Sequence, residues 1–501
     1  MSETIPAWGI PGQSSTSILG NAVLRREDAT LIRGRGEFVA NQPFDDLLHA
    51  HFVRSTAAHG EILSIDADDA RSMPGVVAVY TSADLGLEDR PPAMGFYASE
   101  AVRPFLARDR VRFVGEPVAV VVAETAYQAA DAAEAVWADI EPLTAVVSLD
   151  DAVAAETVLF EARDDNVMWQ IPSAGAIDFS GCEVVVTEDL WNSRVASVSI
   201  EPRVVAASFA DGKLTFWASS QGTHDFRDGA AKCLGMDPSE VRVLVKDIGG
   251  GFGAKGMVSE EEVIVGQLSR LIGRPVRWVE SRTENLSAFV HGRAQAQTVT
   301  IGGTREGRVT HYRLDVVQDC GAYPKWGAFL PEFTRQLASG VYDIANLEFS
   351  AVSVATNTAP TCAYRGAGRP EATAAVERAM DLFATEIGMD AVEVRRTNLL
   401  ASEAFPYTTP TGTSMDSGDY EGSLDRALAA ADYAGLRAEQ QRRRAAGDPV
   451  HMGSGVATYV EITGFGGSEY GEVRLRDDGT VLASTGATPI GTGHHTTWAM
   501  I

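Results

Sequence analysis

The segment with the clearest chemical potential is Val241–Gly256, which reads VRVLVKDIGGGFGAKG. A β-branched run precedes the glycines of its GGGFG motif, and apolar residues at helical spacing follow. Because glycine lacks a side chain, it adopts positive φ angles and lets another group approach the main chain closely. The segment therefore predicts a strand, a tight turn and a helix, with a polar group bound to the backbone of the turn.

One interpretation of this turn is a dinucleotide phosphate site of a nicotinamide-dependent dehydrogenase. The pattern Gly249-x-Gly251-x-x-Ala254 fits that fingerprint, and Glu280 ends the next predicted strand, where a ribose-binding acid would stand. Glu280 lies farther from the turn than the usual spacing of about 20 residues, however. A purely structural turn and a site for another cofactor stay open beside this interpretation.

The surrounding elements must hold the turn in place. Ser259 and Glu262 form a capping-box pattern at the start of a helix predicted over Val258–Ile272. Pro370 suits the first turn of another helix, since its missing N–H would be unpaired there anyway. A long helix is expected over Gly422–Ala446, and nearer the start apolar β-type runs precede an alanine-rich helical stretch, which indicates an α/β domain.

Several other segments accompany the turn along the chain. SIEPR (199–203) and WASSQGTHDFR (217–227) precede it, and AYRGAGRPEAT (363–373) and PIGTGHHTTWAMI (489–501) follow it. Together with LIRGRGEFVAN and VRFVGEPVAVVVAETAYQAADAAEAV near the start, they resemble the molybdenum-binding large subunit of the xanthine oxidase family. That family includes aldehyde oxidases and carbon monoxide dehydrogenase, and the resemblance runs from about Ala22 to the last residue.

The resemblance implies an α+β fold, with an N-terminal α/β hammerhead domain followed by an incomplete molybdopterin-binding domain. We expect an extended arm over residues 1–21, the hammerhead domain over 22–147 and a linker over 148–173. The first part of the molybdopterin-binding domain would then occupy 174–501, with its C-terminal part missing.

The implied cofactor is molybdenum–molybdopterin, in the cytosine dinucleotide form, with no direct protein ligand to the metal. The implied reaction oxidises an aldehyde or N-heterocycle with water as the oxygen source. FAD and [2Fe-2S] clusters would sit on partners, an FAD-binding medium subunit and an iron–sulfur small subunit. The 4 cysteines of this chain are widely spaced without a C-x-x-C pair, so they offer no iron–sulfur ligand set of their own.

The resemblance also assigns cofactor-binding residues. Gln221 matches a glutamine that hydrogen-bonds an oxygen ligand of molybdenum, and an amide can donate there without adding charge. Gly251, Phe252 and Gly253 match the part of the turn whose main-chain N–H groups face the metal's oxygens. Arg365 matches an arginine beside the metal, where its permanent charge would stabilise an oxyanion.

The GTGHH segment corresponds to a loop that contacts the pterin or its phosphate. Gly491, Thr492 and Gly493 are the expected contacts, with Thr492 in place of the family's usual glutamine and His495 in place of a glutamate. The adjacent histidines His494 and His495 suggest a metal site. In the extended segment that we expect here they would point to opposite sides, which argues against such a site.

Three positions bear on the substrate pocket. Gly256 stands where purine-oxidising relatives carry a glutamate, and Ala367 replaces an aromatic residue that clamps planar rings, which leaves the pocket wider or differently filled. Gly366 stands where copper-binding carbon monoxide dehydrogenases carry a cysteine. Without a thiolate there is no soft ligand for Cu(I), so we expect no copper and no oxidation of carbon monoxide.

Composition and charge exclude some partners. With 42 Lys+Arg against 68 Asp+Glu, the net charge of −26 repels phosphate backbones, so nucleic acid is not an expected partner. The longest apolar run, around Val118–Ala123, is far shorter than the roughly 20 residues of a membrane span. The N-terminus carries no secretory signal pattern, so the expected compartment is cytoplasmic.

The sequence ends at Ile501, directly after GTGHH, whereas the family pattern continues. The glutamate that acts as the base is expected beyond Ile501, so the catalytic residue is unknown, and we expect the isolated chain to be inactive unless a complementary segment or second chain completes it. The leading hypothesis is thus a portion of a molybdenum hydroxylase. An inactive assembly or structural homologue and the nicotinamide-dependent dehydrogenase are the alternatives.

Overall fold

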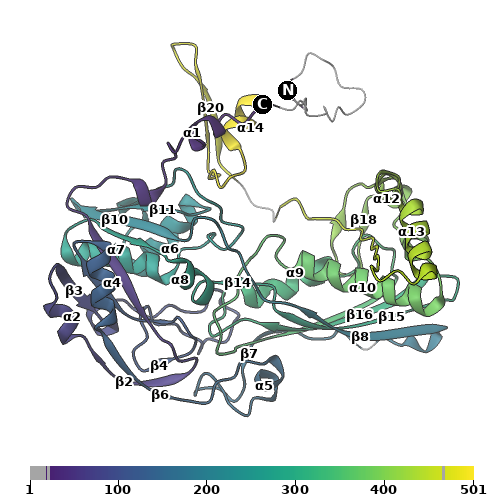
Figure 1. The fold of residues 1–501 in the computed structure, drawn as a ribbon, viewed down its shortest axis with the longest axis horizontal. Coiled ribbons are helices and arrows are strands. Elements are labelled where there is room, and N and C mark those ends of the chain that lie inside the picture. The colour runs from purple at the N-terminus through teal and green to yellow at the C-terminus, as the bar shows by residue number, and fades with distance from the viewer. Residues whose placement is uncertain (1–17, 20–22, 176, 465–468) are drawn as a thin grey trace.

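The computed structural model describes residues 18–19, 23–175, 177–464 and 469–501. These residues form two lobes side by side, and a smaller projection rises above one of them (Figure 1). One lobe contains a seven-stranded sheet and the other a five-stranded sheet. Of the arm predicted over residues 1–21, only Ile18 and Leu19 belong to the described residues.

The seven-stranded sheet joins strands of the first predicted domain to strands that flank the glycine turn. Strand β1 pairs in parallel with β13, so one sheet continues across the boundary predicted near residue 148. In spatial order the strands are β12 (Val241–Leu244), β11 (Lys213–Ala218), β10 (Val204–Ala210), β13 (Val276–Val279), β1 (Leu48–Arg54), β5 (Pro117–Ala123) and β3 (Val76–Tyr80).

Strand β5 is buried along its whole length, which explains its run of valines and alanines. Helix α4 (Ala126–Glu134) packs against β1 and β5, and helix α7 (Glu260–Ile272) packs against β10 and β13. The capping box predicted at the start of α7 is confirmed. The Ser259 hydroxyl accepts the main-chain N–H of Glu262, and the Glu262 carboxylate accepts the main-chain N–H of Ser259. A small sheet flanks this lobe, with β4 (Arg110–Val111), β2 (Gly60–Asp66) and β6 (Trp137–Pro142).

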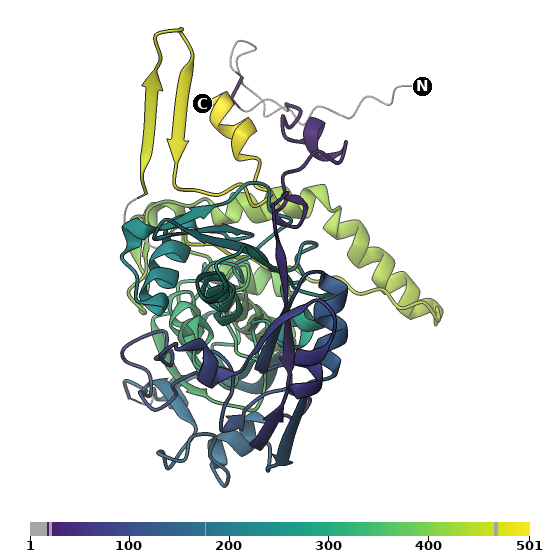
Figure 2. The ribbon, with the colours of Figure 1, turned by 90° about the vertical axis from the view of Figure 1, so that its left-hand side faces the viewer.

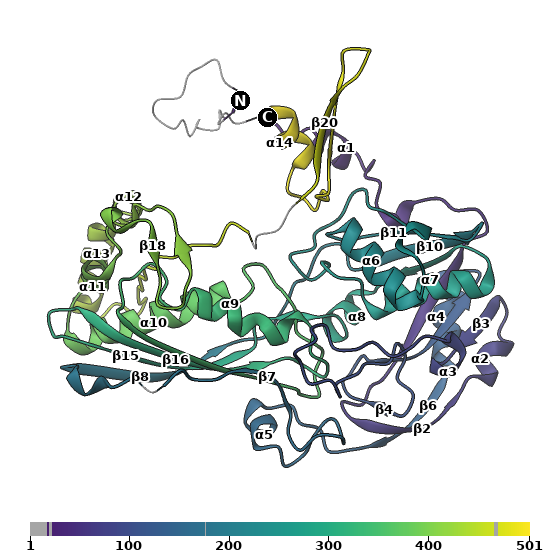
Figure 3. The same cartoon turned by 180° about the vertical axis from the view of Figure 1, so that it is seen from behind.

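The five-stranded sheet of the second lobe is long and covered by helices on one face (Figure 3). Helix α10 (Arg369–Ile387) packs against β8 and β15, with Pro370 in its first turn as predicted. The stretch expected to be a linker holds α5 (Leu149–Ala154) and the edge strand β7. In spatial order the strands are β7 (Val167–Ile171), β17 (Asn346–Val354), β16 (Val309–Asp319), β15 (Gln295–Gly303) and β8 (Val184–Asn192).

One predicted helix differs from the structure. The helix expected over Gly422–Ala446 is two helices, α12 (Tyr420–Ala430) and α13 (Tyr433–Ala446). They are separated at Asp432, which has a φ of 48° and caps α13 by accepting the N–H of Gly435. Aspartate tolerates this left-handed conformation and is a favoured cap, so the break follows from its short polar side chain.

The projection contains the last described residues. It comprises the hairpin of β20 (Gly471–Leu475) and β21 (Val481–Thr485), with helix α14 (His494–Met500) beside it (Figure 2). Within the described ranges, no helix is both long and apolar enough to cross a membrane. The remaining helices and paired strands are α1 (Asp28–Leu31), α2 (Asp68–Ser72), α3 (Ser82–Leu85), α6 (Thr223–Leu234), α8 (Arg282–Ser287), α9 (Leu330–Gln336), α11 (Ala391–Asn398), β9 (Val195–Ala196) with β14 (His291–Gly292), and β18 (Tyr407–Thr408) with β19 (Ser414–Met415).

Candidate functional site

The glycine turn, residues 249–253, lies between the end of β12 and the start of α7. Its backbone is packed closely against Glu201 and Gln221. A Cβ placed on Gly249 would lie 2.4 Å from Glu201 Cβ, and one placed on Gly251 would lie 2.5 Å from Gln221 Oε1. Phe252 has a φ of 55°, in the left-handed region. The absence of side chains at these glycines is therefore what allows Glu201 and Gln221 to reach the backbone of the turn.

Gln221, just beyond the end of β11, holds one side of the turn. Its Oε1 accepts the N–H of Gly253 at 2.7 Å and the N–H of Lys255 at 3.3 Å. Its Nε2 makes no hydrogen bond within the described part of the chain, so the amide retains a donor. The N–H of Gly253, predicted to face the cofactor, therefore donates to Gln221 instead. The N–H groups of Gly251 and Phe252 make no hydrogen bond to the described residues.

Arg365 meets the turn from another direction. Its main-chain N–H donates to the carbonyl of Phe252 at 3.0 Å, and its own carbonyl accepts a hydrogen bond from Arg293 at 2.6 Å. The Arg365 side chain is exposed, and its guanidinium forms no ion pair with a described residue. The backbone of Arg365 is thus fixed while its charge stays available.

The GTGHH segment reaches the same place. The Thr488 hydroxyl donates to the Gln221 carbonyl at 2.7 Å. Gln221 and Thr492 line one cavity of about 660 Å³. Gly491 and Gly493 line a second, smaller cavity of about 40 Å³ together with Ile248, which directly precedes the turn. The GTGHH segment therefore lies beside Gln221 and Ile248, the residues that border the turn, although the sequence separates these segments widely.

The conformation predicted for the paired histidines is wrong. His494 begins helix α14, with Gly493 as its N-cap at a φ of 75°, so the two histidines are not in an extended segment. The glycine lets the chain reverse and start a helix, which a residue with a side chain would do less readily. The His494 ring lies 6.0 Å from the Trp498 ring one helical turn later.

Two further residues contact the turn, and the sequence reasoning gave neither a role. Glu201 Oε2 accepts the N–H of Gly249 at 2.8 Å, and the Lys255 ammonium donates to the Glu201 carbonyl at 2.8 Å. Burial lowers the pKa of Lys255, and nearby Glu201 opposes that shift. Glu201 Oε1 and Ser199 Oγ are buried with no hydrogen-bond partner in the described structure. The SIEPR motif contains Ser199 and Glu201, but nothing in it indicated that these residues lie beside the glycine turn.

The predicted substrate-pocket positions have different surroundings. A Cβ on Gly256 would have only the Gly253 carbonyl near it, at 3.2 Å. Ala367 is buried with Phe333, and Trp326 and Phe329 pack on the same cluster. The Trp326 and Phe333 rings are stacked, with centroids 6.4 Å apart and an interplanar angle of 11°. Aromatic rings from another part of the chain thus pack around the small residue at 367.

The geometry opposes the dinucleotide interpretation. Helix α7 begins at Glu260, well after the glycines, so its N-terminus does not lie directly on the turn. Glu280 is only 2% exposed, and it accepts hydrogen bonds from Arg203 at 2.9 Å and from Asn285 at 2.8 Å. A carboxylate enclosed in this way is not available to a ribose.

Comparison with known families is consistent with this site. Residues 33–144 match the aldehyde oxidase and xanthine dehydrogenase a/b hammerhead domain, and residues 159–399 and 426–501 match the molybdopterin cofactor-binding domain.

Individual relatives give the same result. The chain is 34% identical to the carbon monoxide dehydrogenase large chain of Hydrogenophaga pseudoflava, over 95% of this chain and 63% of that protein. It is 35% identical to the nicotine 6-hydroxylase large subunit of Paenarthrobacter nicotinovorans, over 97% of this chain and 62% of that protein. The structure of quinoline 2-oxidoreductase from Pseudomonas putida 86 superposes with a TM-score of 0.91 at 31% identity, over 96% of this chain and 64% of that one. The chain thus spans less than two thirds of the length of these relatives.

Proposed function

Because this chain belongs to the xanthine oxidase family of molybdopterin-binding large subunits, we propose that it forms the cofactor-binding part of a molybdenum hydroxylase that oxidises an aldehyde or N-heterocycle. Water would be the oxygen source. The observation that carries the proposal is the contact of Gln221 and of the Arg365 backbone with the glycine turn, which leaves the Gln221 Nε2 and the N–H groups of Gly251 and Phe252 without partners among the described residues.

The residues present fit a molybdenum–molybdopterin group. Gln221 Nε2 and the N–H groups of Gly251 and Phe252 would donate to its oxygen atoms, and Arg365 would balance its negative charge. Ser199 Oγ and Glu201 Oε1, buried without partners, would pair with polar groups of the pterin. Gly491, Thr492 and Gly493 would contact the cytosine dinucleotide part or the pterin. When bound, the group would transfer an oxygen atom to the substrate and accept two electrons from it.

The substrate proposal rests on the aromatic surroundings of Ala367. Trp326 and Phe333 stack beside Ala367 and make its surroundings apolar, which would favour a planar ring or an aryl aldehyde over a small gas. The lack of an acidic side chain at Gly256 removes a hydrogen-bonding group for purines. Arg365 would stabilise negative charge that develops on the substrate oxygen or nitrogen.

Copper is not part of the proposal. A Cβ at Gly366 would lie 2.4 Å from Pro370 Cγ, and the glycine has a φ of 95°. The backbone at this position therefore resists any side chain, including the thiolate that a Cu(I) ion would need.

The proposal includes groups from outside these 501 residues. The Glu201 carboxylate, which contacts the turn, accepts the N–H of Gly249 and lies 3.5 Å from the Lys255 ammonium, so we assign the proton-accepting glutamate to a complementary segment. Electrons would leave through [2Fe-2S] and FAD on partner subunits.

The test is isotopic. The complete large subunit with its partners would be supplied with quinoline or benzaldehyde and an electron-accepting dye in ¹⁸O-labelled water. We expect dye reduction and one ¹⁸O atom in the product. Dye reduction without ¹⁸O in the product, or no turnover of either substrate class by a molybdenum-loaded complex, would refute the proposed function and favour an assembly role.

A further inference from the structure

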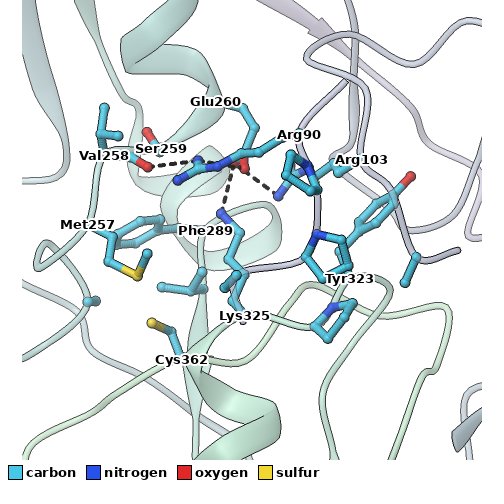
Figure 4. Close-up of a pocket in the computed structure, with 17 residues that line it drawn as sticks. Arg90, Arg103, Met257, Val258, Ser259, Glu260, Phe289, Tyr323, Lys325 and Cys362 are labelled. Carbon is cyan, nitrogen blue, oxygen red and sulfur yellow. Dashed lines mark hydrogen bonds and ion pairs between the residues drawn. The ribbon is translucent and has the colours of Figure 1, made fainter. Parts of the chain in front are cut away.

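A small enclosed cavity lies beside the glycine turn, on the side facing the first predicted domain. Its volume is about 40 Å³, enough for a few water molecules. Segments distant in the sequence line it (Figure 4): residues 90–93, Ala101 and Arg103, Ala254 and residues 257–260 after the turn, residues 289–290, residues 323–325 and Cys362. Of these residues, only Ala254 lies in the GGGFGAKG motif itself.

Three cations surround one carboxylate in this cavity (Figure 4). Glu260 Oε1 lies 3.1 Å from Arg90 Nη1, and Glu260 Oε2 lies 3.0 Å from Arg103 Nη1 and 2.8 Å from Lys325 Nζ. The Glu260 side chain is only 2% exposed. Burial alone would raise the pKa of Glu260, but Arg103, Lys325 and Arg90 hold it well below its ordinary value. Glu260 is therefore charged and still leaves the group with excess positive charge.

Two other carboxylates near Arg103, Glu116 and Glu261, do not supply full compensation, since Glu261 pairs with Arg203 and Arg54. Glu116 accepts hydrogen bonds from the Tyr323 hydroxyl at 2.7 Å and from the N–H of Arg112 at 2.6 Å. Burial raises the pKa of Glu116, and Arg103 opposes that shift. Because buried cations are costly unless they are paired, an uncompensated cluster of this kind favours a bound anion.

Arg103 also has a donor without an acceptor. The residue is 6% exposed, and its Nε is buried with no hydrogen-bond partner in the described structure. Its guanidinium lies over the rings of Tyr323 and Phe113, at 5.2 and 5.5 Å from their centroids. Ring contacts use the flat face of a guanidinium, whereas the N–H groups point along its edge. The Nε donor therefore stays available despite these contacts.

The remaining walls are apolar, and a surface groove adjoins the cavity. Phe289, Val258 and Ala254 supply carbon surface. The neighbouring groove, of about 720 Å³, shares Arg90, residues 91–93 and Met257 with the cavity. A ligand thus has a short route from the surface to the cations.

We propose that this cavity binds a carboxylate group, either of a free short-chain acid or at the end of a larger acid that enters from the groove. A carboxylate matches the in-plane donors of Arg103 and the Lys325 ammonium, and its three heavy atoms suit the small volume. A phosphate, which is larger and tetrahedral, fits this cavity less well. The site does not depend on molybdenum, so its test is separate from that of the proposed function.

The test measures acetate binding to the purified chain by calorimetry at constant ionic strength. Saturable binding to the wild type is expected. Lys325→Met should weaken it about tenfold or more, because a charge-assisted hydrogen bond is lost. Glu260→Gln should strengthen it, because one negative charge is removed from the cation cluster. A purely structural cluster would not produce these opposite effects.

The matched control is Arg395→Lys, which alters a buried arginine that pairs with Glu377 and Asp381 in the other lobe. This variant should bind acetate like the wild type even if its thermal stability falls. Competition with benzoate separates the two sources, since displacement of acetate indicates the end of a larger acid and exclusion of benzoate indicates a short-chain acid. Absence of saturable acetate binding, or equal affinity in Lys325→Met and Glu260→Gln, would overturn the proposal.

Discussion

Replacing Gln221 separates two roles of one amide. Gln221→Ala removes the acceptor of the Gly253 and Lys255 N–H groups, which lie 2.7 and 3.3 Å from Oε1. Leaving a buried donor unpaired costs about 1–3 kcal/mol, and the partial exposure of Gly253 places the local cost at the lower end, about 1–2 kcal/mol. Gln221→Glu keeps the acceptor but replaces the free Nε2 donor with negative charge.

Hydrogen–deuterium exchange over the peptide that covers residues 249–256 is the direct assay. A local cost of about 1–2 kcal/mol corresponds to exchange about 5- to 30-fold faster in Gln221→Ala. Gln221→Glu should exchange like the wild type, yet should retain less molybdenum cofactor. Gln170→Ala, an exposed glutamine on β7, is the control and should change neither quantity. If Gln221→Glu accelerates exchange as much as Gln221→Ala, the reasoning about Oε1 is refuted.

Three further predictions concern stability and the pocket. Arg203→Met leaves Glu280 without its buried ion-pair partner and Glu261 with Arg54 alone, and should lower the free energy of unfolding by about 3–5 kcal/mol in urea titrations, whereas a loss below about 1 kcal/mol would contradict the pairing. Burial alone would raise the pKa of Glu261, but Arg203 and Arg54 hold it well below its ordinary value of 4.5. The stabilisation from Glu261 is therefore present above that value and should be lost as pH falls below it, and unfolding midpoints that stay constant between pH 6 and about pH 3 would contradict this. Gly366→Cys should destabilise the loop before α10 through its clash with Pro370 and should bind no copper, as read by thermal melting and elemental analysis. An unchanged melting temperature with bound copper would show that the backbone there accepts a thiolate.

Local signals in the sequence located several elements correctly. The Ser259 and Glu262 capping box and Pro370 act within one helical turn, so their side chains determine where α7 and α10 begin. The glycines of the turn were equally visible, because few other residues permit such a close approach. These effects depend on neighbours in the chain.

Contacts between distant segments could not be predicted in the same way. The bond from Gly249 to Glu201 and the use of the Gly253 N–H by Gln221 join residues far apart in the sequence, and no local pattern reports such pairs. The helix that begins at His494 depends on the left-handed conformation of Gly493, which the sequence permits but does not require. The cations around Glu260 likewise come from three separate segments.

We propose that the glycine turn, held by Gln221 and Arg365, binds the molybdenum cofactor. The most direct test of this proposal is the molybdenum content of the complete large subunit, measured by mass spectrometry in the wild type, Gly251→Ala and Gly181→Ala. A Cβ at Gly251 would lie 2.5 Å from Gln221 Oε1, whereas one at Gly181 meets nothing within 4 Å. We predict one molybdenum per chain in the wild type and Gly181→Ala, with a severe loss in Gly251→Ala. Equal molybdenum content in all three proteins, or none in the wild type, would contradict the account.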